Sequence, residues 1–381
     1  MSRLQAEHLF KVFGRRPEDA VQRLQTGAGR DELRAEGTTA AVIDASIEVG
    51  EGQIFVVMGL SGSGKSTLLR MLNGLLEPTS GTVRFDGQDL TSLSDKELRA
   101  VRSRKISMVF QHFALFPHRS VLENAAYGLE VQGVPRAERE RRATRALELA
   151  GLKGWEKSWP DELSGGMQQR VGLARALATD ADLLLMDESF SALDPLIRRD
   201  MQDQLLELQK TLKKTIVFIT HDLNEAMRLG DRIAVMRDGR IVQTGSAEDI
   251  LVRPANDYVA SFIQDVDRSR VLTAGAVMAE VGTVLGMTAP DGAKLTTAAE
   301  FRAAAPATVG VDTPLADLFS ACSASSVPVA VTDERGELAG AVTADRLLAV
   351  LGEPGRPNAP AAVPAQAGPS SEAEGTVAAD A

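Results

Sequence analysis

The N-terminal part of the chain alternates short apolar runs with longer polar segments. Three runs are apolar at nearly every position, over residues 53–59, 182–188 and 215–222. Strands that are apolar on both faces are typical of the buried, often parallel, strands of an α/β sheet. Charged segments with a helical pattern lie between these runs, at 93–103 and 135–150. Because this alternation continues to about Phe262, the sequence predicts an α/β fold.

Two further strands are predicted near the N-terminus. Residues 1–13 alternate polar and apolar positions, and AVIDASIEV at 41–49 forms a second run. Residues 14–38 lie between them, and they are charged and partly helical. We interpret residues 14–38 as an insertion between the first two strands.

The pattern changes after residue 262. Residues 263–306 are rich in alanine and other small residues and have weak periodicity. A β-α-β-β-α pattern begins at Ala307, and a Pro/Ala-rich tail without apolar periodicity begins at Glu353. Such a tail is expected to be disordered. The prediction is a large α/β domain, a small α/β domain and a tail, at 1–262, 263–352 and 353–381.

Composition narrows the functional classes. The chain has 381 residues and a formal net charge of −10, which disfavours electrostatic binding of nucleic acid. The arginines of 135–150 are interleaved with glutamates, so an exposed mixed-charge helix is expected there. Cys322 is the single cysteine, which excludes an internal disulfide. We expect neither a signal peptide nor a membrane span, because no apolar run approaches the roughly 18 residues that a span needs.

A phosphate-binding loop is predicted at GLSGSGKST, residues 59–67. The stretch matches G-x-x-x-x-G-K-[ST], follows a buried strand and opens a helix, which is the context that the motif requires. Glycines let backbone N–H groups surround phosphate oxygens, and the helix N-terminus adds partial positive charge. Lys65 would contact the β- and γ-phosphates, and the Ser66 hydroxyl would bind Mg²⁺. The predicted nucleotide-binding residues here are Gly59, Ser61, Gly62, Ser63, Gly64, Lys65, Ser66 and Thr67.

Two carboxylates follow the apolar run LLLM. Asp187 stands at the end of this predicted strand, where it can hold Mg²⁺, and Glu188 comes next. Ligands bind at the carboxyl ends of the strands in such sheets, so Glu188 is a candidate general base for the attacking water. The N-K-x-D element with which GTPases read guanine is not found in the sequence, which favours ATP as the nucleotide.

A second serine-glycine turn occurs in LSGGMQQR, residues 163–170. The phosphates of one nucleotide are already surrounded by the loop at 62–67, so this turn can reach a γ-phosphate only from another direction. A head-to-tail pair of chains would supply that direction. Each nucleotide would then lie between the phosphate loop of one chain and the LSGGM turn of the other.

The whole of residues 1–262 resembles the nucleotide-binding domain of ABC transporters. The resemblance rests on six motifs in order: GLSGSGKST, FQHFALFP, LSGGMQQR, LLLMDE, SALD and THD. Their order and number make the resemblance specific, whereas each motif alone has a broad false-positive risk.

The resemblance implies a role for each matching residue. Gln111 would reach Mg²⁺ and the attacking water, and His221 would hold the γ-phosphate and the water. Phe13 resembles the aromatic residue that stacks on adenine. Ser164, Gly165 and Gly166 would contact the γ-phosphate of the partner chain's nucleotide. Asp194 would lie at the seam between the two chains. The implied catalytic set is Lys65, Gln111, Glu188 and His221, and the implied Mg²⁺ set is Ser66, Gln111 and Asp187.

Two segments resemble the ATPase subunit of glycine betaine/proline betaine importers more narrowly, namely FALFPHRSVLENAAYGLE and SFSALDPLIRRDMQ. That family implies transmembrane permease subunits, an extracytoplasmic substrate-binding protein acting indirectly, and a peripheral location at the cytoplasmic face of the membrane. An importer for choline, carnitine or an amino acid is the first alternative, because ATPase motifs do not select the solute. A soluble, non-transport ABC ATPase is the second.

The same family carries a pair of CBS modules at its C-terminus, and residues 263–352 resemble this pair only in part. Residues 307–352 show one full module pattern, while TAGAVMAE at 273–280 resembles the start of a degenerate one. Asp345 stands one residue earlier than the aspartate of adenosine-binding modules, and Arg346 occupies that position. The C-terminal domain is therefore predicted to be a reduced CBS-like regulatory or dimerisation domain, with a packing or dimerisation role favoured over adenosine binding.

Overall fold

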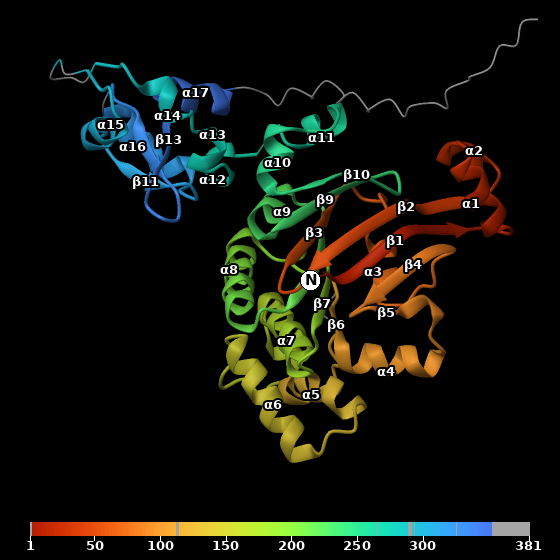
Figure 1. The fold of residues 1–381 in the computed structure, drawn as a ribbon. Coiled ribbons are helices and arrows are strands. Elements are labelled where there is room, and N and C mark those ends of the chain that lie inside the picture. Colours follow the sequence, from red (N-terminus) through yellow and green to blue (C-terminus); the bar gives the residue numbers. More distant parts are fainter. Residues whose placement is uncertain are drawn as a thin grey trace, which may run out of the picture.

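The computed structural model describes residues 2–111, 114–264, 266–288, 292, 294–324 and 326–352. The predicted tail at 353–381 lies outside the described residues. Figure 1 shows the N-terminal part as a layered α/β structure from which an all-helical lobe projects, with the C-terminal unit beyond α10 and α11.

The centre of the fold is a six-stranded sheet with the order β10-β9-β3-β8-β7-β6. Its strands are parallel except for β10, which pairs with β9 in antiparallel register. The strands predicted from continuous apolar runs, β3, β7 and β8, are buried at every position and lie side by side. The bounds are β3 Ile54–Met58, β6 Ile106–Val109, β7 Leu183–Asp187, β8 Thr215–Thr220, β9 Arg232–Arg237 and β10 Arg240–Gly245.

Both faces of this sheet are covered, which explains why its strands are apolar throughout. Along β3, Ile54, Val56 and Met58 belong to one hydrophobic cluster, and Phe55 and Val57 belong to another. The first cluster packs beneath α7 to α9, and the second lies against α3 and a four-stranded sheet. That second sheet has the order β2-β1-β4-β5 and is antiparallel; its bounds are β1 Ser2–Phe13, β2 Thr39–Gly50, β4 Ser80–Phe85 and β5 Gln88–Asp89.

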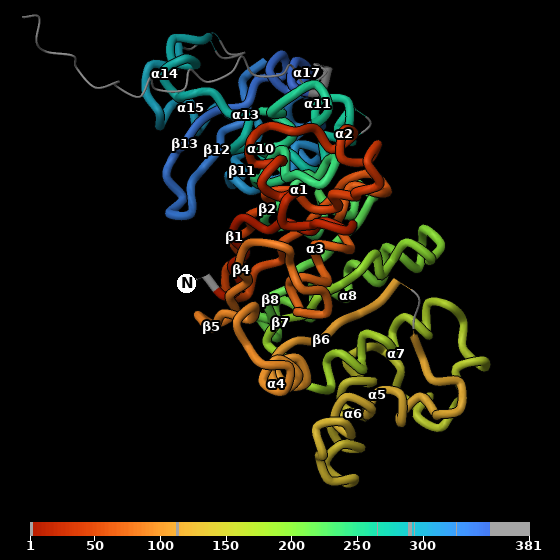
Figure 2. Tube along the Cα trace, turned by 90° about the vertical axis from the view of Figure 1, so that its right-hand side faces the viewer, coloured from red at the N-terminus to blue at the C-terminus, as the bar shows by residue number. Residues whose placement is uncertain are grey.

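Helices surround these sheets and form a separate lobe. The α5, α6 and α7 helices share their own hydrophobic cluster, and Figure 2 shows them together away from the antiparallel sheet. The predicted charged helix at 93–103 is confirmed as α4, which buries no side chain. The bounds are α3 Lys65–Leu72, α4 Asp95–Lys105, α5 Val121–Val131, α6 Arg136–Leu149, α7 Gly165–Ala178, α8 Pro195–Leu212, α9 Leu223–Leu229, α10 Ala247–Val252 and α11 Asp257–Phe262, with 3-10 turns at Leu90–Ser92 and Pro160–Glu162.

The insertion at 14–38 is folded as two short helices, α1 Pro17–Gln25 and α2 Arg30–Ala35. Their apolar faces pack on the ends of β1 and β2 in a small hydrophobic cluster of their own. The cluster consists of Phe10, Val12, Ala20, Val21, Leu24, Leu33, Ala40 and Ile43.

The C-terminal unit contains the predicted β-α-β-β-α order around a three-stranded sheet, β11-β12-β13. The segment 273–280 joins this unit, because Ala279 pairs with Ala341 of β13 and Thr273 pairs with Pro314. Arg346 donates to the Val277 carbonyl, which favours the packing role over adenosine binding. The bounds are α12 Arg268–Val271, α13 Ala274–Val277, α14 Val281–Val284, α15 Ala298–Ala304, β11 Thr308–Gly310, a 3-10 turn at Leu315–Leu318, α16 Phe319–Ala324, β12 Val329–Thr332, β13 Leu338–Val342 and α17 Ala344–Gly352.

The domain boundary at residue 262 stays a prediction. One hydrophobic cluster includes Ile250 and Val259 on its N-terminal side and Val277 and Val331 on its C-terminal side. Apolar packing is therefore continuous where the sequence pattern changes.

Candidate nucleotide site

The phosphate loop leaves β3 at its carboxyl end and opens α3. Two of its glycines have no room for a side chain: a Cβ on Gly59 would lie 2.2 Å from the Met236 carbonyl oxygen, and one on Gly64 would lie 2.3 Å from that of Ala41. Gly62 and Gly64 also have φ angles of 79° and 105°, which disfavour residues with a Cβ. The glycine spacing of the motif is thus required by the sheet that surrounds it.

Lys65 is buried within the loop, with 4% of its side chain exposed. Its Nζ donates to the carbonyl of Gly59 at 2.8 Å and lies 3.5 Å from Oε1 of Glu188. Burial lowers the pKa of Lys65, and the charge of Glu188 opposes this shift. A cation buried in this way has a strong interaction with any anion that enters the loop.

The carboxylates that follow β7 lie directly beside the loop. Oδ1 of Asp187 accepts a hydrogen bond from Ser66 Oγ at 3.0 Å. Burial raises the pKa of Asp187, and the Ser66 hydrogen bond opposes that shift. Glu188 has a φ angle of 44°, and its backbone N–H donates to the Ile219 carbonyl of β8 at 3.0 Å. The strand pairing therefore holds Glu188 in a turn that directs the carboxylate toward Lys65.

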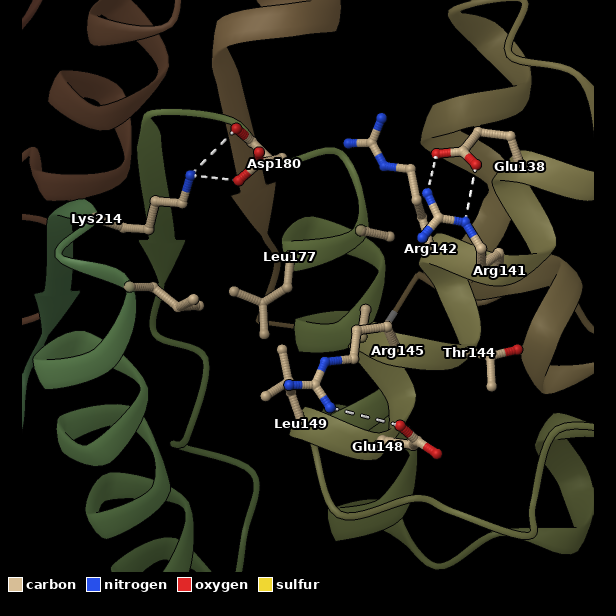
Figure 3. A pocket seen from close by; sticks show the side chains of 13 residues that line it. Glu138, Arg141, Arg142, Thr144, Arg145, Glu148, Leu149, Leu177, Asp180 and Lys214 are labelled. Carbon is tan, nitrogen blue, oxygen red and sulfur yellow. Dashed lines mark hydrogen bonds and ion pairs between the residues drawn. The ribbon is translucent and has the colours of Figure 1, made fainter.

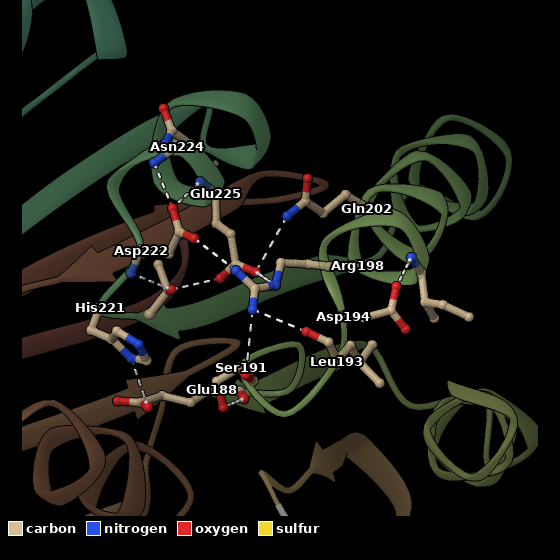
Figure 4. Close-up of polar contacts among 12 residues, drawn as sticks. Glu188, Ser191, Leu193, Asp194, Arg198, Gln202, His221, Asp222, Asn224 and Glu225 are labelled. Atoms are coloured by element: carbon tan, nitrogen blue, oxygen red, sulfur yellow. Dashed lines mark hydrogen bonds and ion pairs between the residues drawn. The ribbon is translucent and has the colours of Figure 1, made fainter. Parts of the chain in front are cut away.

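His221 follows β8 and contacts the candidate base. Its Nδ1 is 3.0 Å from Oε2 of Glu188, a contact that Figure 4 shows at the end of the strand. Gln111 follows β6 and donates to Ser191 Oγ at 3.4 Å. Adjacent parallel strands thus deliver these two side chains and the Asp187–Glu188 pair to one edge of the sheet.

A hollow of 420 Å³ opens over these groups. The predicted residues Ser61, Gly62, Gly64, Lys65, Ser66, Thr67, Gln111 and Glu188 line it, together with Arg30, Thr39 and Ala41, which the sequence reasoning did not single out. Arg30 comes from the insertion, so its presence depends on a tertiary contact that no local motif encodes.

Several predicted residues do not line this hollow: Gly59, Ser63, Asp187 and His221, and in addition Phe13, Ser164, Gly165, Gly166 and Asp194. Phe13 is 46% exposed and pairs with Thr39, which does line the hollow. Ser164 and Gly165 are exposed at the start of α7, where Ser164 Oγ caps its own helix by accepting from the Met167 N–H at 3.4 Å. Gly166 is buried against α8: a Cβ there would lie 2.6 Å from Cγ2 of Ile197. Asp194 caps α8 by accepting from the Ile197 N–H at 3.1 Å.

A polar network behind the site was also missed by the sequence reasoning. Arg198 donates to Oδ2 of Asp222 at 3.0 Å and to the carbonyls of Ser191 and Leu193 at 3.4 and 3.1 Å (Figure 4). Beside it, the buried Glu225 accepts from Thr220 Oγ1 at 2.6 Å. The segment that carries Asp194 is thereby tied to the segment that carries His221.

The residues fit an Mg²⁺-nucleotide. Mg²⁺ is usually held by one or two carboxylates, with phosphate oxygens and water as further ligands, and Asp187 with Ser66 offers such a partial set. The hydroxyl of Ser63 is buried without a hydrogen-bond partner among the described residues, inside the turn that would surround the phosphates. A group of three or more potential metal-ligating His, Cys, Asp or Glu residues was not found in the described part of the chain.

A second hollow, of 690 Å³, lies between α6, the end of α7 and Lys214. Most of its charged side chains are engaged with one another: for example, Arg141 pairs with Glu138 at 2.8 Å, and Lys214 pairs with Asp180 at 2.6 Å (Figure 3). It contains none of the predicted site residues. We therefore place the functional site at the phosphate loop.

Comparison with known proteins identifies relatives of this chain. The family model described as ABC transporter matches residues 42–191. The chain is 49% identical to the glycine betaine transport ATP-binding protein OpuAA of Bacillus subtilis, over 92% of both chains. It is 44% identical to the glycine betaine/proline betaine transport system ATP-binding protein ProV of Escherichia coli, over 93% of this chain and 98% of that protein. The dimeric structure of MJ0796, a bacterial ABC transporter cassette, is 32% identical with a TM-score of 0.54, over 64% of this chain and 98% of that one.

The fold and the phosphate site define an ABC-type P-loop ATPase. The structural neighbours and the family match confirm that part of the predicted fold class. More narrowly, the chain belongs to the ATP-binding subunits of ABC transporters, in the family of the glycine betaine transport ATP-binding proteins. Among the described residues, we find no helix with the length and apolarity needed to span a membrane.

Proposed function

We propose that this chain hydrolyses ATP to energise the import of glycine betaine or proline betaine through separate transmembrane permease subunits. The observation that carries the proposal is the 49% identity to a glycine betaine transport ATP-binding protein over 92% of both chains. Identity of this extent includes the segment after residue 262, so it is not limited to the motifs common to all ABC ATPases. The chain would act at the cytoplasmic face of the membrane, and an extracytoplasmic substrate-binding protein would deliver the solute to the permease.

In this proposal the chain's own groups divide the reaction between them. Lys65 and the backbone of Gly62 to Gly64 bind the phosphates, and Phe13 stacks on adenine. Mg²⁺, held by Ser66 and Asp187 with Gln111 nearby, would neutralise charge on the phosphate oxygens. Glu188 accepts a proton from the attacking water, and His221, at 3.0 Å, fixes the orientation of the Glu188 carboxylate.

The proposal requires two copies of the chain. Ser164, Gly165 and Gly166 do not line the hollow that their own chain forms, so they would contact the γ-phosphate held by a partner chain. Asp194 would lie at the seam between the two copies. Loss of the bridging γ-phosphate on hydrolysis would then open the pair, and the permease subunits would respond to that motion. The dimeric cassette among the structural neighbours supports this arrangement.

The test is uptake of labelled glycine betaine after an osmotic upshift, in cells that lack other betaine transporters. The native chain should restore uptake, and the Glu188→Gln variant should not. Excess unlabelled proline betaine should compete, whereas an unrelated amino acid should not. Uptake that no betaine reduces would contradict the proposed solute class, and uptake that is equal with the variant would contradict the proposed role of Glu188 in energising transport.

A second solute has a specific observation in its favour. The trimethylamine N-oxide transport system ATP-binding protein TmoW of Ruegeria pomeroyi is 50% identical over 74% of this chain and 82% of that protein. Trimethylamine N-oxide should therefore be included as a competitor in the same assay. Stronger competition by trimethylamine N-oxide than by proline betaine would favour this second function.

A further inference from the structure

The insertion at 14–38 begins and ends beside the nucleotide hollow. The chain leaves β1 directly after Phe13 and enters β2 at Thr39, and these two residues are partners across the strands. Thr39 lines the hollow. The insertion is therefore attached at the end of the site that we assign to adenine.

The position of the insertion is fixed by packing and by ion pairs. Leu33 of α2 is fully buried in the cluster that joins the insertion to β1 and β2. Arg23 of α1 pairs with Glu36 at 2.6 Å and with Glu32 at 2.8 Å, which links the two helices. The side chains that α2 presents to the ATPase core are consequently held in place.

Arg30, the first residue of α2, reaches the phosphate loop. Its Nη2 donates to the Gly62 carbonyl at 3.4 Å, and its Nη1 lies 3.1 Å from Oδ1 of Asp238. Asp238 belongs to the β9–β10 turn, which contacts the same loop because the Gly239 N–H donates to the Ser63 carbonyl at 2.9 Å. Arg30 lines the hollow with Lys65, so a second cation stands in the wall of the nucleotide site.

We propose that Arg30 is a further nucleotide-binding residue, whose guanidinium contacts the ribose and α-phosphate of ATP. This inference rests on the proposed function, because it assumes that the hollow binds ATP. A guanidinium carries five N–H donors, and the two contacts above use two of them, so donors remain for phosphate oxygens. Because Arg30 enters from the adenine end, its contact falls on the part of the nucleotide that ATP and ADP share.

The experiment is calorimetric titration of the full chain with Mg²⁺-ATP and Mg²⁺-ADP, in the Glu188→Gln background to prevent turnover. Arg30→Ala should lower the affinity for both nucleotides about ten-fold, which is the scale of one charge-assisted hydrogen bond. The affinity of Arg30→Lys should lie between those of the parent and of Arg30→Ala, because an ammonium keeps the charge and loses the planar guanidinium. Equal affinity in Arg30→Ala and in the parent, or a loss confined to ATP, would overturn the proposal.

Two controls separate binding from a structural role. Arg23→Ala removes the ion pairs within the insertion but no group of the hollow, and it should leave both affinities unchanged. Asp238→Asn releases Arg30 from its partner and should leave nucleotide affinity equal or increase it. If either variant matches the loss of Arg30→Ala, Arg30 acts by holding the insertion or the turn, and the proposal is wrong. If the parent itself binds neither nucleotide, the proposed function fails instead.

Discussion

The phosphate loop and the LSGGM turn have similar serine- and glycine-rich sequences and different surroundings. Each places serine and glycine residues at the start of a helix, α3 in one case and α7 in the other. The loop is enclosed by β3, the β9–β10 turn and β2, and its own chain supplies the carboxylates of Asp187 and Glu188. The turn keeps Ser164 and Gly165 exposed.

This difference shows that a motif's surroundings decide whether it forms a site alone. Gly166 is packed against α8, so the turn has a fixed position although its first two residues are exposed. An ordered turn of this kind suits contact with a second molecule. Variants of the two regions should therefore differ in which step of the reaction they remove.

The largest effect is expected in the Glu188→Gln variant, which removes the carboxylate that lies beside the phosphate loop. Loss of the proton acceptor should lower ATP turnover by about 10²- to 10⁴-fold, the usual contribution of a general base. Binding of ATP should persist, because Lys65 and the loop glycines remain. Release of phosphate and titration calorimetry measure the two quantities. Glu207→Gln, on an exposed position of α8, is the matched control and should leave turnover unchanged.

The comparison itself can be tested by mixing two inactive variants. Lys65→Ala removes the positive charge with which the phosphate loop binds phosphate. Ser164→Arg blocks the LSGGM turn with a bulky cation. Each should be inactive alone, because a homodimer of either has two damaged sites. A mixed dimer has one intact site, so with random pairing and independent sites about a quarter of native turnover should return. A mixture that stays as inactive as its components would argue against the shared site.

A smaller effect is expected from Arg198, which ties the segment of Asp194 to the segment of His221 behind the site. Arg198→Ala should lower turnover about ten-fold with ATP affinity unchanged, because removing a charged hydrogen-bond donor costs about 1.5–3 kcal/mol. Arg228→Ala is the matched control: Arg228 pairs with Asp203 and also joins α9 to α8, but it touches neither backbone segment of the site. An equal loss of turnover in Arg198→Ala and Arg228→Ala would show that the contact between α8 and α9, and not the bonds of Arg198 to the site segments, maintains turnover.

The smallest effect is expected at Phe13. Phe13→Ala should weaken the binding of ATP and of ADP equally, by the roughly 0.5–1.5 kcal/mol typical of an aromatic stacking contact. Phe13→Trp should restore affinity because it keeps a stacking surface. Phe319→Ala, at an exposed phenylalanine of the C-terminal unit, is the control. Nucleotide affinity is measured by titration calorimetry. An equal loss of affinity in Phe13→Ala and Phe13→Trp would contradict the stacking role.

Sequence reasoning found those parts of the site that are encoded locally. The loop, the Asp187–Glu188 pair and His221 each follow a strand whose apolar run identifies it, and parallel strands bring their ends together. The central strands were predicted from the same apolar runs, and the insertion from its charged composition between two predicted strands. The roles of these residues stay predictions until the variants above are measured.

Contacts between distant segments were beyond that reasoning. Arg30 meets Asp238 across 208 positions of sequence, and nothing in the charged pattern of the insertion indicates which of its arginines faces the loop. Arg198 received no role from the sequence, although it donates to the Leu193 carbonyl and lies 3.8 Å from the buried Glu225. The sequence indicated that residues 273–280 resemble the start of a module, but the pairing of Ala279 with Ala341 of β13 was not predicted.

The hydrophobic cluster that crosses residue 262 has a consequence for how the molecule melts. Val259 and Ile263 share this cluster with Leu272 and Val331, so apolar side chains on both sides of residue 262 are buried in one continuous core. Packing of this kind makes unfolding cooperative across its whole extent. Heating should therefore give one calorimetric transition for the ATPase part and the C-terminal unit, and a chain cut at residue 262 should melt earlier than the full chain.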